Sequence, residues 1–163
     1  GVDNETVIGT TTTTNALVHG LRKPVITANV DASATAPGAI YNFADANGAI
    51  ITLPDSGTGS EIGKTYEFVV TVSATSNNHK VTCTDTTNEK IYGQLNMIDI
   101  DTSNTETIVA AVDSNNFSSV FLNGTTNGCV GSRFRFTNVA ADVWFVEGDI
   151  HHTGNVSTPF ATS

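Results

Sequence analysis

One segment near the end of the chain, from Gly131 to Gly148, constrains the fold most because it reads as a complete antiparallel hairpin. Its first half, Arg-Phe-Arg-Phe, alternates charged and aromatic residues, so a strand there places both phenylalanines on one face and both arginines on the other. Its second half, Val-Trp-Phe-Val, predicts a second strand that Gly148 ends. We therefore expect Phe134 and Phe136 to face the core.

The rest of the chain repeats this pattern of short strands separated by turns. The clearest strand covers 65–72, where a large apolar residue stands at every second position. Segments 39–43 and 49–53 flank Asn47-Gly48, a tight-turn signal, and predict a second hairpin. No window shows apolar residues sustained at helical spacing. We predict an all-β fold, an antiparallel β-sandwich or jelly roll of about eight to ten short strands.

Three regions are expected along the chain. Residues 1–24 contain a run of threonines and few large apolar residues, which predicts an extended N-terminal arm. Residues 25–152 are predicted to form the β-sandwich domain. Residues 153–163 are polar and contain Gly154 and Pro159, and they are predicted to form a tail that lies over the surface or reaches a neighbour.

The charge of the chain argues against two classes of partner. Seven basic residues stand against 16 acidic ones, a formal net charge of −9, which would repel a nucleic-acid backbone. No stretch approaches the ~20 apolar residues of a membrane helix. In so acidic a chain Arg133 and Arg135 stand out, and two roles are open to them: pairing with acidic groups of a neighbouring subunit, or keeping the sheet face soluble.

Several motifs that suggest chemistry fail on spacing or context. Residues 57–65 are similar to a P-loop, but Thr58 stands where the motif needs glycine, and a strand rather than a helix is expected to follow. Nothing resembles a nucleophile elbow, and no histidine and acid can be tied to a serine. We therefore predict that the protein is not an enzyme, with no catalytic or cofactor-binding residues.

Candidate metal ligands are equally weak. Oxygen-bearing side chains alternate from Asp99 to Thr105, but Asn104 replaces the glycine of an EF-hand and Ala110 its glutamate. Two readings are left, an irregular calcium site or an exposed acidic turn. The pair His151-His152 would point to opposite faces of a strand, so a solvated pair is expected rather than a chelate. We predict no metal site.

The cysteines and aromatic residues each have two readings. Cys83 and Cys129 are either small buried hydrophobes or a single disulfide. Trp144 is expected to lie half in the core and half at an interface, and the alternative is a flat stacking platform for sugars. The tyrosines that could join such a platform are Tyr41, Tyr66 and Tyr92.

Two segments together resemble small virion structural proteins of tailed bacteriophages that decorate or stabilise the capsid. The first runs from Ile-Ile-Thr-Leu-Pro at 50–54 through a glycine loop to Gly-Lys-Thr-Tyr-Glu-Phe-Val-Val at 63–70. The second is the hairpin, with its Trp-Phe-Val-Glu-Gly end. Such proteins often carry a strand ending in Leu-Pro, a glycine before an alternating aromatic strand, and a terminal hairpin with a tryptophan.

This resemblance implies a β-sandwich or jelly roll on the outer surface of the virion, bound to the lattice of the major capsid protein. It also implies a homo-oligomer, often a trimer, with no catalytic residues. The arm, residues 1–24, could strap the domain to the shell. The alternatives are a head or tail fibre module, or, in a different class, a secreted carbohydrate-binding β-sandwich with Trp144 or a tyrosine exposed.

Overall fold

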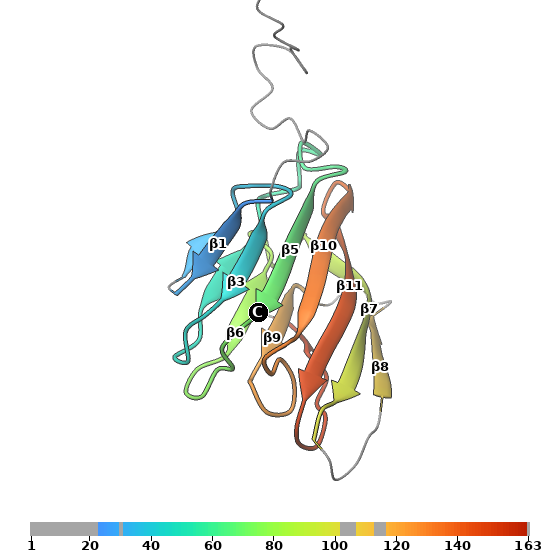
Figure 1. The fold of residues 1–163 in the computed structure, drawn as a ribbon. Helices are drawn as coiled ribbons and strands as arrows, with labels where there is room; N and C mark the ends of the chain where they lie inside the picture. Colours follow the sequence, from blue (N-terminus) through green and yellow to red (C-terminus); the bar gives the residue numbers. More distant parts are fainter. Residues whose placement is uncertain (1–22, 30, 102–106, 113–116, 163) are drawn as a thin grey trace, which may run out of the picture.

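The structure, a computed structural model, describes residues 23–29, 31–101, 107–112 and 117–162. This part of the chain forms twelve strands in two sheets and no helix (Figure 1). The all-β prediction is confirmed, whereas its finer description as a sandwich or jelly roll stays a prediction. The large sheet has the order β1-β3-β5-β10-β11-β7-β8 and consists of β1 (Val25–Ala28), β3 (Ile40–Phe43), β5 (Thr65–Val70), β7 (Lys90–Asp99), β8 (Thr107–Val112), β10 (Arg133–Ala140) and β11 (Val143–His152). The small sheet has the order β12-β9-β6-β4-β2 and consists of β2 (Ala32–Ser33), β4 (Ile50–Thr52), β6 (His79–Thr82), β9 (Ser119–Leu122) and β12 (Phe160–Ala161).

Both sheets contribute to one hydrophobic core. Phe134 and Phe136 lie in it, 2% and 0% exposed, as the alternation predicts. Phe68 of β5 packs between them, with its ring centroid 5.4 Å from that of Phe134 and 5.8 Å from that of Phe136. The small sheet adds aliphatic side chains, and Figure 1 shows β6 and β9 behind the large sheet. The main aliphatic contributors are Ile51, Val81, Val120 and Leu122.

The predicted hairpin is present and longer than expected. Strands β10 and β11 pair antiparallel across a turn at Asp142, whose φ is 59°. The prediction that Gly148 ends the second strand is wrong, because β11 continues to His152. Gly148 lies opposite Phe134 within the ladder, where a Cβ would stand 2.5 Å from the Phe134 Cα. The glycine therefore permits a close approach of two strands instead of ending one.

The sheets are mixed rather than purely antiparallel, which corrects that part of the prediction. In the large sheet β1 is parallel to β3, β3 to β5, and β11 to β7. In the small sheet β2 is parallel to β4 and β4 to β6. Alternation within a strand fixes which side chains face the core but carries no information on the direction of the neighbouring strand.

The second predicted hairpin is wrong. The turn itself forms, with the Gly48 amide donating to the Asp45 carbonyl at 3.1 Å. However, β3 belongs to the large sheet and β4 to the small sheet, so the turn carries the chain from one sheet to the other. Tyr41 of β3 and Ile51 of β4 both meet in the shared core from opposite sheets. A tight-turn signal predicts that the chain changes direction, not that the flanking strands pair.

Part of the predicted C-terminal tail belongs to the small sheet. Within the predicted tail 153–163, β12 pairs with β9, and Phe160 is buried in the core. The apolar side chain of Phe160 explains why these residues join the sheet. At the other end, residues 1–22 of the predicted arm lie outside the described residues, while the Pro24 carbonyl accepts a hydrogen bond from Ile40.

Candidate functional site

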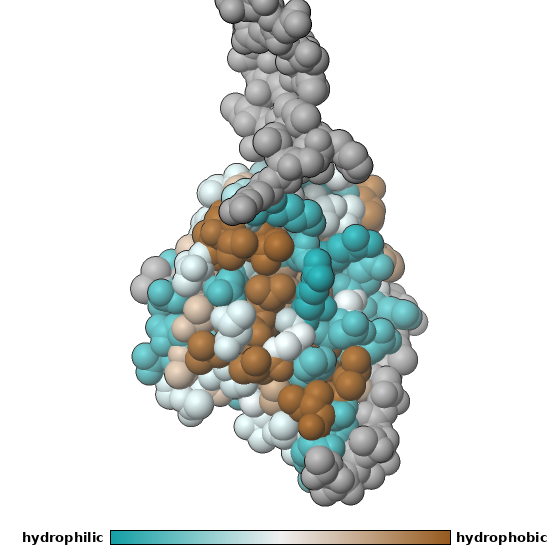
Figure 2. Space-filling view, viewed as in Figure 1, coloured by the Kyte–Doolittle hydropathy of each residue, from teal (hydrophilic) through white to brown (hydrophobic). Residues whose placement is uncertain are grey.

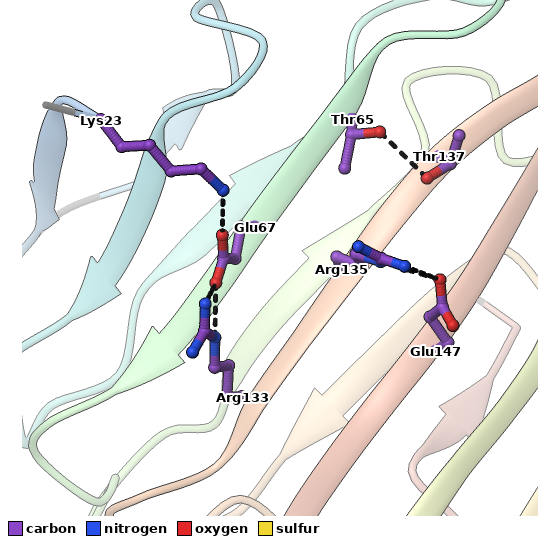
Figure 3. Close-up of polar contacts among 7 residues, drawn as sticks. All are labelled: Lys23, Thr65, Glu67, Arg133, Arg135, Thr137 and Glu147. Carbon is purple, nitrogen blue, oxygen red and sulfur yellow. Dashed lines mark hydrogen bonds and ion pairs between the residues drawn. The ribbon is translucent and has the colours of Figure 1, made fainter. Parts of the chain in front are cut away.

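The outer face of the large sheet carries the strongest concentration of charged side chains in contact with one another. Because Phe134 and Phe136 face the core, Arg133 and Arg135 point outward, with side chains 65% and 57% exposed. The register places Arg135 opposite Glu67 of β5 on one side and opposite Glu147 of β11 on the other. Figure 3 shows acids and bases of three neighbouring strands meeting on this face.

Glu67 is the centre of this arrangement. Its carboxylate is largely buried beneath two cations: Lys23 Nζ lies 2.8 Å from Oε2, and the Arg133 guanidinium donates to Oε1 (Figure 3). Burial raises the pKa of Glu67, but the hydrogen bonds and charges of Lys23 and Arg133 outweigh it and hold the pKa below its ordinary value. The two cations therefore fix an ionised carboxylate in the middle of the sheet face.

Further polar pairs extend the face on both sides. Arg135 Nε donates to Glu147 Oε1 at 2.7 Å, and both groups are well exposed, so the pair adds little stability. On the next strand over, Asn96 donates to Asp149 at 2.8 Å. Together with Glu67, Lys23 and their neighbours, these side chains line an open groove of about 480 Å³.

The groove is nearly neutral although the chain carries a formal charge of −9. Its basic residues, Lys23, Arg133 and Arg135, are balanced by Glu67, Glu147 and Asp149. Charge-neutral, preorganised polar surfaces favour protein contacts that an unbalanced acidic surface would repel.

An apolar flank borders the polar groove. Val25 of β1 and Ile40 of β3 stand in register with Glu67, on the same face. Val25 is 62% exposed. Figure 2 shows hydrophobic residues over the β1, β3 and β5 side of this face, hydrophilic residues over the upper part of β10 and β11, and a second hydrophobic patch near the lower ends of β11 and β7. The face therefore combines apolar and polar surface, as protein interfaces do.

Three of the four aromatic residues that could form a stacking platform for sugars are buried. Trp144 is 0% exposed, and Tyr41 and Tyr66 are also buried. The expectation that Trp144 lies half at an interface is thus wrong: its position on β11 faces the core, and its ring packs against Tyr66 at 5.8 Å. Tyr92 is half-buried, on the outer side of β7.

The remaining candidates are placed as follows. Residues 57–63 form turns and bends, and β5 begins at Thr65, as predicted. Of the acidic alternation, Asp101 donates its amide to Asp99, whereas residues 102–106 lie outside the described residues. Among the described residues no group of three or more potential ligands could hold a metal ion.

The histidines at the end of β11 lie on opposite faces, as predicted. His152 is buried and its Nδ1 lies 3.0 Å from the Gly154 carbonyl oxygen, so the prediction of a solvated pair is wrong for this residue. His152 points inward from β11 and contacts the segment that follows the strand, at Gly154. His151 is half-buried, with Nδ1 3.1 Å from the Val130 carbonyl oxygen.

Both cysteines are free and buried, which matches the reading as small hydrophobes and not the disulfide. Burial raises the pKa of the Cys83 thiol, and the nearby Glu89 carboxylate raises it further. Burial also raises the pKa of Cys129. Neither thiol is therefore activated as a nucleophile.

Sequence reasoning missed one polar cluster altogether, the contacts of the buried carboxylate of Glu89. Glu89 Oε1 accepts hydrogen bonds from the Ser56 amide at 2.7 Å, the Ser56 hydroxyl at 2.5 Å and the Trp144 indole at 3.3 Å. Oε2 accepts one from the Asp85 amide at 2.8 Å. No basic side chain of the described residues pairs with it. Glu89 thus joins two loops and β11, and no local sequence motif predicts these contacts.

Comparisons with protein-family models, with curated proteins and with solved structures found no match to this chain. Among the described residues, no helix is long and apolar enough to cross a membrane.

The lowered pKa of Glu67 predicts a specific pH dependence. An unfolded-state glutamate titrates near pH 4.5, so between that value and the lower folded-state value the unfolded chain binds more protons. The ion pairs of Glu67 therefore stabilise the fold above about pH 4.5, and this contribution is lost as the pH falls through the folded-state pKa. Urea unfolding of the wild type and Glu67→Gln across this window should show a smaller loss of stability in the variant. The same pH dependence of the free energy of unfolding in both proteins would contradict the expectation.

Proposed function

We propose that this protein is a non-enzymatic virion structural protein that binds the outer surface of a phage capsid as a decoration or stabilising subunit. The resemblance carried by 50–70 and 131–148 supports the class of protein. The ion pair between Lys23 and Glu67 supports binding through the outer face of the large sheet. Lys23, which follows residues 1–22 in the sequence, lines the neutral groove.

A single partner would therefore contact both the arm and the neutral groove. On this proposal the lattice of the major capsid protein contacts the outer face of the large sheet, while the arm straps the domain to a neighbouring site. The ion pairs that the largely buried Glu67 forms with Lys23 and Arg133 hold the polar part of the face in one geometry before binding. Such preorganisation lowers the entropy cost of docking onto a repeating surface. Three copies around a lattice axis would multiply the contacts, and sedimentation of the free protein tests the trimer.

Binding to empty heads of the phage that encodes this chain tests the proposal. Deletion of residues 1–22 should reduce co-sedimentation with heads at least tenfold, while the domain keeps its unfolding temperature. Arg135→Glu places an acid between Glu67 and Glu147 and should also weaken binding, whereas the charge-matched control Lys90→Glu, at the first residue of β7 and outside the groove, should not.

Failure of the wild-type protein to bind heads, or its absence from purified virions, would overturn the proposed function. Full binding by the truncated chain would overturn the role of the arm. Cryo-electron microscopy of particles distinguishes a capsid position from a head or tail fibre.

A further inference from the structure

A second recess lies on the outer face of the small sheet. It has a volume of about 290 Å³, at the lower end of the range of small-molecule sites. Its base is a row of three side chains in register across β4, β6 and β9: Ile50, Lys80 and Phe121. Because Val81 and Val120 beside them face the core, this row faces away from it.

Lys80 is the cation of this recess. Its Nζ lies 4.9 Å from the centroid of the Phe121 ring, a cation–π contact. The other basic side chains that the structure describes each reach an oxygen: Lys23, Lys64, Arg133 and Arg135 reach carboxylates, and Lys90 reaches a carbonyl. Within that same set, Lys80 has no oxygen partner. In a chain with 16 acidic residues, an ammonium without an acid suits an anionic group from outside.

Amide side chains form the wall of the recess. Asn77 and Asn78 come from the loop before β6, and Asn47 comes from the turn before β4. The described contacts give the side-chain amides of Asn77 and Asn78 no hydrogen-bond partner. A carboxamide offers two donors and an acceptor, the pattern that neighbouring hydroxyl groups require.

Backbone hydrogen bonds and a close contact join the two loops that form the wall. The Thr75 amide donates to the Ala46 carbonyl at 2.8 Å, and the Lys80 amide donates to the Ala49 carbonyl at 2.9 Å. The two loops touch at Gly48, where even a Cβ would stand 2.6 Å from the Asn78 carbonyl oxygen. The recess is therefore formed before any ligand arrives.

We propose that this recess binds an acidic saccharide, with the carboxylate of a hexuronate paired to Lys80. The amides of Asn77 and Asn78 bond its hydroxyl groups, and its C–H face packs on Phe121 and Ile50. A neutral hexose would leave the ammonium unpaired, and a simple carboxylate would leave the amides unused. Asp31 also lines the recess, and the Ile50 amide donates to its Oδ1 at 2.8 Å, which holds this carboxylate at the rim.

This site does not depend on the proposed function. It lies on the small sheet, across the core from the groove of the large sheet. A subunit bound to a shell through the large sheet would keep the recess open to solvent. Failure of head binding and failure of saccharide binding are therefore separate results.

The test is a titration of the full chain followed by amide chemical shifts, with sodium glucuronate, glucose and sodium acetate at matched ionic strength. We expect saturable shifts at Gly48, Asn78 and Phe121 with glucuronate and a dissociation constant of the order of 1 mM. Glucose and acetate should bind at least tenfold more weakly. No saturable shift with glucuronate, or acetate binding as tightly as glucuronate, would overturn the proposal.

Two variants locate the site. Lys80→Met keeps an apolar stem over Phe121 and should lower glucuronate affinity at least tenfold, whereas Lys90→Met, at a lysine outside the recess, should leave it unchanged. Asn78→Asp, nearly the same in shape, places a negative charge against the ligand and should also lower affinity. Unchanged affinity in either recess variant, with dispersed spectra showing a folded chain, would exclude this recess as the site.

Discussion

Glu89→Gln is expected to lower the free energy of unfolding by about 3 kcal/mol, because it leaves a buried donor facing another donor. The carboxylate of Glu89 accepts four hydrogen bonds, three at one oxygen and one at the other. A carboxamide has one oxygen and one NH₂ group. Whichever way it turns, the NH₂ group meets the Asp85 amide or the three donors from Ser56 and Trp144. Glu89→Ala should cost more, since it removes every acceptor.

Urea unfolding at neutral pH measures this effect, and the fluorescence of Trp144 reports on the same site. Trp144 is the only tryptophan of the chain and its indole donates to Glu89, so emission should change in the folded variant. Glu147→Gln is the matched control, because the Arg135–Glu147 pair is exposed and should change stability by less than about 1 kcal/mol. Equal stability of the two variants would show that the hydrogen bonds of Glu89 do not stabilise the fold as expected.

Gly93→Ala is expected to lower stability by at least about 3 kcal/mol. Gly93 lies in β7 opposite Val146 of β11, with a φ of 124° that side chains rarely adopt. A Cβ there would stand 2.0 Å from the Val146 carbonyl oxygen, so one strand must move. The backbone conformation alone costs about 1–2 kcal/mol, and displacing the paired strand adds to it.

Gly63→Ala separates these two terms. Gly63 also has a positive φ, 83°, but a Cβ there would meet no atom within 4 Å. This control should therefore lose only the conformational term, about 1–2 kcal/mol in urea unfolding. If both variants lose the same stability, the close approach of β7 and β11 is not what Gly93 provides.

The sequence predicts the fold best where the information is local. Alternation in 131–148 predicts the hairpin and the burial of Phe134 and Phe136, because side-chain direction in a strand depends only on neighbours in the chain. The same reasoning fails at 39–53, where the turn forms but its two strands join different sheets. Strand partners are chosen by the shared core, which links residues far apart in the sequence.

The candidate site shows the same division. Outward placement of Arg133 and Arg135 follows from the alternation, and an acidic partner was expected from a neighbouring subunit or not at all. The acids that pair with them, Glu67 and Glu147, belong to the same chain. Glu67 lies 66 residues before Arg133, so only the β5–β10 register reveals the pair. Glu89 was missed because two of its donor residues, Ser56 and Trp144, lie in another loop and another strand.

The parallel pairing of β7 with β11 sets how the chain reaches this fold. Ten residues of each strand pair, from Lys90 with Val143 to Asp99 with His152, so 53 positions separate every pair of partners. The β10–β11 hairpin can close within microseconds. Pairing β7 with β11, in contrast, requires the long connection between them to lose conformational entropy before any stabilising contact forms. Proteins dominated by such distant pairings fold in milliseconds to seconds. We expect the arrival of β7 on the finished hairpin to set the folding rate, and a chain awaiting it to expose an unpaired edge of β11 to other copies.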